Sequence, residues 1–236
     1  MICPKCHKPY LFMGRSNDSR VSCRKCKYQE VFKQPAYEGY VESTYDKKLL
    51  RTSATDPLLA RFINISKLED EQTVLDYGCG RGDYVKEMSL YTKGVVGVDI
   101  DITLAQRMFP DLKFRKIESV AIDMPNAAFD WIICVNVIEH VQDHDALLNE
   151  FRRLLKPEGK LFITTFDIDF MLHSIHYDPT HLIEWTQHEF ESLISKKFKI
   201  VSSFKAGSMF NYYPLNIVLT KMLRPELCIV AKKNNE

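Results

Sequence analysis

The chain lacks the long apolar runs and the secretion signal that would place it in or across a membrane. None of its 236 residues falls in an apolar stretch near the ~20 residues needed to cross a bilayer. The first residues, M-I-C-P-K-C, contain no apolar signal-peptide core. We therefore expect a cytoplasmic protein without a membrane span, and its cysteines are not expected to form a disulfide framework.

Net charge is also nearly absent, at +1, but it is distributed unevenly. Residues 1–33 carry eight Lys or Arg against two acids, a local net of +6, which leaves −5 for residues 34–236. A basic segment can mark a contact with nucleic acid, and equally its lysines can offset the charge of metal-bound thiolates. The composition, 45% hydrophobic and 27% charged, fits one main soluble domain with a small appendage.

Cysteine is concentrated near the N-terminus, where C-P-K-C and C-R-K-C form two Cys-x-x-Cys pairs separated by 16 residues. The four residues are Cys3, Cys6, Cys23 and Cys26. This spacing is typical of a zinc ribbon, in which four thiolates close the tetrahedral shell of a structural ion. The residues between the pairs predict a β-hairpin with Gly14, Asn17 and Asp18 at its tip. We expect a structural zinc module over residues 1–33, with no chemistry of its own.

Glycine is sparse, with nine residues, but three of them fall together in V-L-D-Y-G-C-G-R-G-D. A short strand ending at Asp76 runs into these glycines, which allow a tight strand-to-helix turn and close approach of a ligand. The next apolar run, V-V-G-V-D, ends in Asp99, an acid placed to bind the hydroxyls of a ribose. A nicotinamide enzyme would show G-x-G-x-x-G, which this loop does not contain.

The segments around the glycine loop alternate between strands and helices, which predicts an α/β fold with a parallel sheet. Helices are expected to begin near Pro57, Asp83, Asp101 and Asp143, and at Thr186, where Glu189 completes a capping box. The seven expected strands are Thr73–Asp76, Val95–Asp99, Leu112–Lys116, Trp131–Val135, Leu161–Phe166, Phe198–Ser203 and Glu226–Ala231. In such sheets ligands bind at the carboxyl ends of the strands.

This sequence resembles the class I S-adenosylmethionine (SAM) methyltransferases of the type 11 kind over residues 46–233. The resemblance is carried by L-D-Y-G-C-G-R-G, V-V-G-V-D, F-D-W-I-I-C-V-N-V-I-E-H-V and L-L-K-P-E-G-K-L-F-I-T. It implies a doubly wound, mostly parallel seven-stranded sheet, a Rossmann-like methyltransferase fold, over residues 57–236. Residues 34–56 would then be a linker that covers the cofactor or simply packs against the domain.

The resemblance also implies SAM as cofactor and a set of residues that bind it. For the acid that contacts the adenine amine, Glu118 is nearer the expected strand end than Asp123, which fits the following turn. The expected cofactor-binding residues are Asp76, Gly78, Cys79, Gly80, Asp99, Ile100, Ile117, Glu118, Asn136 and Val137.

Candidate catalytic residues follow the fourth and fifth expected strands. The run N-V-I-E-H, residues 136–140, starts beside the expected position of the cofactor's methyl group. After the fifth strand, His173, His176 and His181 lie in a loop that ends where the helix at Thr186 begins. The resulting candidates are Glu139, His140 and His181.

Three interpretations of these residues stay open. His140 or His181 can act as a general base on an acceptor hydroxyl, since the histidine pKa is near 6.5. Alternatively, Glu139, His140 and His181 bind a divalent cation: E-x-x-E-H with a later histidine resembles the metal-dependent small-RNA 2′-O-methyltransferases, and E-x-x-E-H recurs in ubiquinone-pathway O-methyltransferases. Here Asn136 replaces the first glutamate, which weakens a site for a hard cation. In the third interpretation Glu139 and His140 only cap and orient the next helix.

We expect a SAM-dependent methyltransferase acting on an oxygen, less readily a nitrogen or carbon, of a metabolite, glycan or natural-product precursor. One alternative is an RNA methyltransferase that uses the zinc ribbon for RNA contact, because the ribbon and A-Y-E-G-Y-V (36–41) resemble ribosomal-RNA guanine methyltransferases. The other is a non-catalytic SAM-binding scaffold, against which the intact glycine loop and Asp99 argue.

Overall fold

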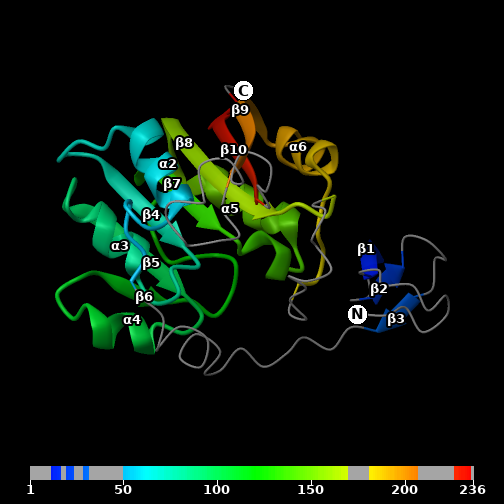
Figure 1. Cartoon of the computed structure of the whole chain (residues 1–236), viewed down its shortest axis with the longest axis horizontal. Helices are drawn as coiled ribbons and strands as arrows, with labels where there is room; N and C mark the ends of the chain where they lie inside the picture. Colours follow the sequence, from blue (N-terminus) through cyan, green and yellow to red (C-terminus); the bar gives the residue numbers. More distant parts are fainter. Residues whose placement is uncertain are drawn as a thin grey trace.

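The computed structural model describes residues 50–169, 181–206 and 226–234, together with the backbone of three short N-terminal strands (Figure 1). These strands, β1 (Phe12–Ser16), β2 (Arg20–Cys23) and β3 (Gln29–Val31), form an antiparallel sheet in the order β1-β2-β3. The predicted hairpin is confirmed, because Ser16 of β1 pairs with Arg20 of β2. One detail was wrong: Gly14 lies within β1, where the register is irregular, and not at the tip.

The zinc prediction is not settled by these strands. Cys3, Cys6 and Cys26 lie outside the described residues, and of Cys23 only the backbone is described, at the end of β2. A structural zinc ion in residues 1–33 therefore stays a prediction.

The main domain is built on one sheet in the order β6-β5-β4-β7-β8-β10-β9. Its strands are β4 (Thr73–Tyr77), β5 (Gly94–Asp99), β6 (Phe114–Lys116), β7 (Phe129–Val135), β8 (Leu155–Phe166), β9 (Phe198–Ala206) and β10 (Glu226–Lys233). All neighbours pair in parallel except β10, which runs antiparallel to both β8 and β9. The predicted seven-stranded, mostly parallel sheet is confirmed.

The start of β8 differs from the prediction. The strand begins at Leu155 instead of Leu161, because Leu155 already pairs with Phe129 before the register slips and resumes at Lys160 opposite Trp131. The slip spans K-P-E-G, residues 156–159. Its glycine, Gly159, is packed so closely on β7 that an added Cβ would lie 2.9 Å from the Phe129 carbonyl oxygen.

Helices connect the strands, and several begin where their capping residues predict. They are α2 (Pro57–Ser66), α3 (Asp83–Met88), α4 (Thr103–Met108), the 3-10 turn η1 (Ile138–His140), α5 (His144–Leu154) and α6 (Gln187–Ser195). The side chain of Asp56 accepts hydrogen bonds from the first turn of α2, and Thr186 with Glu189 forms the predicted capping box of α6. Helix α4 begins two residues later than Asp101, whose side chain accepts from the Thr103 N–H.

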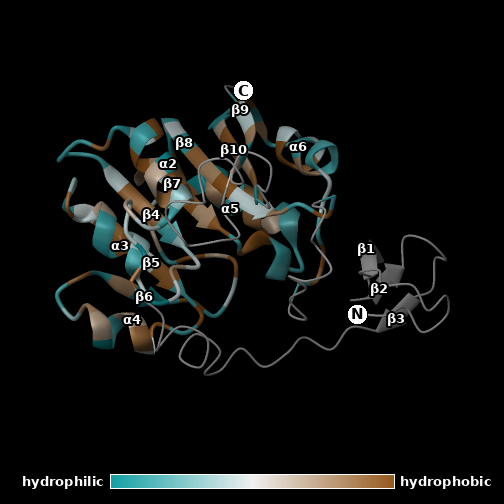
Figure 2. Cartoon of the chain, in the orientation of Figure 1, coloured by the Kyte–Doolittle hydropathy of each residue, from teal (hydrophilic) through white to brown (hydrophobic). Residues whose placement is uncertain are grey.

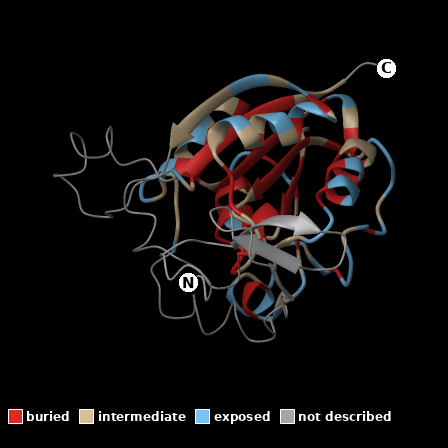
Figure 3. Cartoon of the chain, turned by 90° about the vertical axis from the view of Figure 1, so that its right-hand side faces the viewer, coloured by how far each residue is buried: buried red, intermediate tan, exposed pale blue. Residues whose placement is uncertain are grey.

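Two hydrophobic clusters cover the two faces of this sheet, as a doubly wound fold requires. Along β7 the side chains alternate, with Ile132 and Cys134 in one cluster and Trp131 and Ile133 in the other. Helices α5 and α6 pack on the first face and α2 and α3 on the second, so the central strands β4, β7, β8 and β10 are hydrophobic and mostly buried (Figures 2 and 3). Cys79, Cys134 and Cys228 are buried, as expected of small core residues. No helix among the described residues is long and apolar enough to cross a bilayer.

Candidate active site at the carboxyl edge of the sheet

The glycine loop after β4 leaves room for a ligand. Gly78 and Gly80 have φ of +80° and +51°, a region that side chains other than glycine rarely adopt. A Cβ at Gly78 would lie 2.2 Å from Cγ2 of Val137, so this position is closed by packing between β4 and β7. A Cβ at Gly80 would meet nothing within 4 Å, which leaves its outer face open. The loop is therefore fixed at its base and open above Gly80.

Two acids flank this open space. Oδ2 of Asp99 accepts a hydrogen bond from the Gly80 N–H at 2.8 Å, and Oδ1 accepts one from Asp101 N–H at 3.2 Å. Burial raises the pKa of Asp99, and burial, with the charges of Asp99 and Asp83, raises the pKa of Asp76 to about 8. Among the described residues, Oδ2 of Asp76 has no hydrogen-bond partner although the side chain is buried. Such a group suits a polar ligand that supplies the missing partner.

The segment after β6 carries the other predicted adenine-side residues. Ile117 is buried, and its N–H donates to the Asp99 carbonyl at 2.9 Å, which places it beside the end of β5. Glu118 and Ile100 are exposed. The turn that follows is tied to α5 by Arg153, which donates to the carbonyls of Ile122 and Met124.

A second group of polar side chains gathers where β7, β8 and β10 meet. Asn136, just after β7, has φ of +53°; its Oδ1 accepts from the Thr164 hydroxyl at 3.1 Å, and its amide also bonds Glu226. Because β10 is antiparallel, its first residue, Glu226, stands opposite Phe166, the last residue of β8. Burial raises the pKa of Glu226 to about 8, against the opposing effect of the hydrogen bond from Asn136. Its Oε2 has no partner among the described residues.

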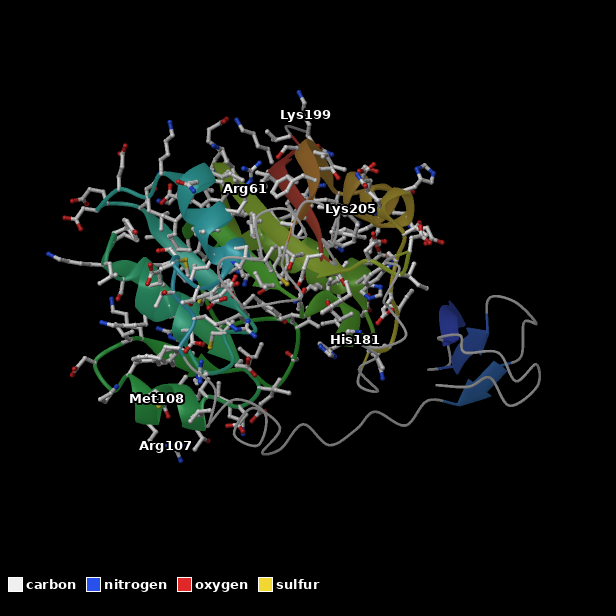
Figure 4. All side chains as sticks on the ribbon, in the orientation of Figure 1. Arg61, Arg107, Met108, His181, Lys199 and Lys205 are labelled. Atoms are coloured by element: carbon white, nitrogen blue, oxygen red, sulfur yellow. The ribbon has the colours of Figure 1, made fainter. Side chains whose placement is uncertain are left out.

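The three predicted catalytic residues lie together. Glu139, His140 and His181 each offer one atom that could bind a metal ion, and these three atoms lie within 4.8 Å of one another. Glu139 is fully buried and His181 is buried, with Nε2 of His181 3.9 Å from Oε1 of Glu139. The rings of His140 and His181 stack edge to face, with centroids 4.9 Å apart. Figure 4 labels His181 on the segment that leads into α6.

Hydrogen bonds from neighbouring elements hold this group in place. Oε2 of Glu139 accepts from the Thr165 hydroxyl of β8 at 3.1 Å, while Oε1 has no partner among the described residues. The Glu139 carbonyl accepts from the Leu182 N–H at 2.8 Å, which ties the His181 segment to η1. Nδ1 of His181 lies 2.5 Å from Oε1 of Glu184, which is buried.

The capping interpretation of Glu139 is wrong. Helix α5 is capped by Asp143, whose side chain accepts from the Ala146 N–H at 2.9 Å. The Glu139 carboxylate turns instead toward Thr165 and His181.

Other predicted positions lie outside the described residues, among them His173 and His176. Conversely, sequence reasoning missed Thr165, Glu184 and Glu226. Glu184 carried a usable signal, because it stands three positions after His181, but Glu226 could be found only by knowing that its strand is antiparallel.

The strand order, with a single antiparallel strand inserted next to the last parallel one, and the glycine loop with its acid define the class I SAM-dependent methyltransferases. Residues 37–214 match the family model described as a methyltransferase domain. The chain therefore belongs to this methyltransferase family.

Similar proteins agree with this assignment. An uncharacterised protein of Methanocaldococcus jannaschii is 35% identical over 131 residues, 53% of this chain and 56% of that protein. A ubiquinone biosynthesis O-methyltransferase of Chromobacterium violaceum is 31% identical over 147 residues, 58% of this chain and 62% of that protein. The chain thus spans less than two thirds of the length of these curated relatives.

Solved structures of low identity share the fold. A SAM-dependent methyltransferase from Archaeoglobus fulgidus superposes with a TM-score of 0.61 at 16% identity, covering 84% of this chain and 100% of that one. One from Aquifex aeolicus gives 0.58 at 17% identity, covering 75% and 89%.

Proposed function

We propose that this methyltransferase methylates a hydroxyl oxygen of a small acceptor, such as a metabolite, glycan or natural-product precursor. The observation that carries the proposal is the buried group of Glu139, His140 and His181. It lies after β7 and β8, on the edge of the sheet where the glycine loop opens. An acceptor held there would lie between the cofactor side and two imidazoles.

The chemistry needs little more than position and one base. The methyl group of SAM is activated by its sulfonium, so holding an acceptor oxygen in line with it supplies much of the rate. The S–CH₃ bond breaks as the O–CH₃ bond forms, the hydroxyl proton passes to an imidazole, and S-adenosylhomocysteine leaves. A histidine is suited to accept that proton near neutral pH. His181 is the better candidate because its ring is fixed by a buried carboxylate.

Relatives support transfer to oxygen. Several proteins that are 31% to 33% identical over part of their length are named ubiquinone biosynthesis O-methyltransferases. The alignment with this chain covers less than two thirds of each of these proteins. The acceptor is therefore inferred from the site together with their names.

A divalent cation at Glu139, His140 and His181 is a second candidate for the same site. Ligands on opposite sides of such an ion at ~2.1 Å lie at most ~4.2 Å apart. The 4.8 Å set would therefore close with small side-chain movements. One carboxylate and two imidazoles suit zinc, iron or manganese better than magnesium. When bound, the ion would polarise a hydroxyl of the acceptor.

We also propose that Cys3, Cys6, Cys23 and Cys26 hold one structural zinc ion. Their spacing and the short antiparallel sheet formed by β1 to β3 support it. The net charge of +6 in residues 1–33 keeps RNA as an alternative acceptor, with this module making the contact.

A methyl-transfer assay separates these proposals. Labelled SAM is incubated with the protein and a cell extract that is then divided into RNA and low-mass fractions. We expect label in the low-mass fraction, lost with His181→Ala. Label in RNA, lost when Lys25 and Lys27 are neutralised, would replace the small acceptor by RNA. A chain that binds SAM but labels neither fraction would be the non-catalytic scaffold.

A further inference from the structure

Glu184 is a buried acid that the proposed reaction does not yet use. Its side chain is 2% exposed, and its Oε1 lies 2.5 Å from Nδ1 of His181, whose side chain is 4% exposed. A carboxylate removed from water is costly unless a charged or strongly donating partner compensates it. Here a ring nitrogen of His181 is a partner. The Glu184–His181 contact is therefore a buried hydrogen bond and not a chance approach of surface groups.

We propose that Glu184 is a positioning residue: it holds the His181 ring with the proton on Nδ1, so that Nε2 presents its lone pair toward Glu139. The proposal rests on the proposed function, since it concerns the same site. In a neutral imidazole one nitrogen donates and the other accepts, and the hydrogen bond at one nitrogen decides which. A carboxylate can only accept, so the nitrogen that faces it must carry the proton.

Neighbouring groups fix the direction in which the ring points. His140 packs edge to face on it at 4.9 Å between centroids, and Phe166 lies against it at 5.7 Å. The N–H groups of Leu182 and Ile183 donate to the Glu139 carbonyl, which anchors the backbone next to the ring. Nδ1 is directed at Glu184, and Nε2 lies on the side of Glu139, 3.9 Å from its Oε1.

The Glu139 carboxylate lies on the Nε2 side of the His181 ring. Nε2 and Oε1 of Glu139 are 3.9 Å apart, too far for a hydrogen bond between them. A hydroxyl that approaches Nε2 to about 2.7 Å, a normal hydrogen-bond distance, can donate its proton there. Oε2 of Glu139 is engaged by Thr165, and Oε1 has no partner among the described residues. A hydroxyl has one proton and donates to one acceptor only, and the proposed tautomer makes Nε2 that acceptor.

Loss of Glu184 would allow the opposite tautomer of His181. With no carboxylate at Nδ1, the proton can move to Nε2 and point at the Glu139 carboxylate. The ring would then donate where it has to accept, and it could not take a proton from the acceptor. A cation at this site would need the same bare Nε2, so the role of Glu184 is the same for either use of the site.

Nitrogen NMR tests the proposal without knowledge of the acceptor. The full chain is labelled with ¹⁵N-histidine, and the protonation of each ring nitrogen is read from long-range ¹H–¹⁵N spectra at pH 8, with His181→Gln assigning the signal. We expect Nδ1–H and bare Nε2 in the wild type, and a shift to Nε2–H in Glu184→Ala. Glu158→Ala, at an exposed carboxylate, is the matched control and should leave the signal unchanged.

Nε2–H or a doubly protonated ring in the wild type would overturn the proposal, as would an unchanged tautomer in folded Glu184→Ala. SAM-induced stabilisation shows whether that variant is folded, and if it is not, the wild-type spectrum alone still decides. The spectrum reports nitrogen protonation and not turnover. Failure here therefore leaves O-methyl transfer standing, and an inactive enzyme with the expected spectrum would remove only the proposed function.

Discussion

The two halves of the site are built in different ways. The cofactor side is one short stretch, the glycine loop after β4 with Asp99 at the end of β5, and its contacts involve backbone N–H groups and positive φ angles. The acceptor side joins β7, β8, β10 and the segment before α6, and its contacts are between buried side chains far apart in the sequence. On the proposed function, the first half would bind through backbone shape, and the second would depend on the protonation of a few carboxyl and imidazole groups.

This contrast predicts that a change at Gly80 has the largest effect, because it removes cofactor binding and with it all turnover. The substitution Gly80→Val places a branched side chain at φ of +51° and fills the open space above the loop. Saturation with SAM at 100 times its Kd should stabilise the wild type by about 2.7 kcal/mol, and the variant should lose this shift. Calorimetry and thermal unfolding with and without SAM measure it. A variant with unchanged SAM affinity would place the cofactor elsewhere.

The acceptor side should fail separately from the cofactor side. His181→Ala is expected to lower methyl transfer by about 10²- to 10⁴-fold, the usual contribution of a general base, while the affinity for SAM stays the same. Turnover with the low-mass fraction and SAM calorimetry give the two readings. If both fell together, the two halves would be one coupled unit; if neither fell, His181 would not be the base.

Metal removal should distinguish the N-terminal module from the main domain. A chelator is expected to unfold residues 1–33, because a module of this size depends on its ion for folding energy, and to leave the SAM-induced shift of the main domain intact. Zinc content per chain and hydrogen exchange of β1 to β3 measure the change. Retained protection of these strands in zinc-free protein would contradict the proposed ribbon.

The same chelation also tests the cation proposed at Glu139, His140 and His181. A loss of turnover that manganese restores would favour that cation.

A pH dependence of stability is also expected from the buried carboxyls. The pKa of Glu226 is raised to about 8 by burial, so the folded chain keeps a proton that the unfolded chain releases near pH 4.5. Stability should therefore fall as pH rises from about 4.5 to 8, by at most about 1.4 kcal/mol per pH unit for each such group. Glu226→Gln should flatten this slope, which denaturant unfolding at several pH values measures. Equal slopes in both proteins would mean that Glu226 is ionised in the folded state.

The same contrast decides what the sequence could predict. The glycine loop, the start of a helix near Asp143 and the capping box at Thr186 were predicted because each depends on residues within a few positions of one another. Glu139, His140 and His181 were singled out as a set, but their approach to within 4.8 Å depends on how β8 and the segment before α6 pack on η1.

Glu226 and Thr165 could not be selected from the sequence. Strand periodicity gives no sign that β10 is antiparallel, and only that direction brings its first residue to the edge where the parallel strands end. Likewise, Thr165 looks like any residue of a buried strand until the Glu139 carboxylate is seen to face it.

The position of β10 also affects how the protein is made. Strands β8 and β9 do not pair with each other, because β10, which follows both in the chain, lies between them. While the ribosome is still synthesising the segment before residue 226, the sheet has a gap on its acceptor side and two open strand edges. Closing that gap requires contacts between residues far apart in the chain, which form late in folding. The nascent enzyme can therefore complete its glycine loop long before it can complete its acceptor site.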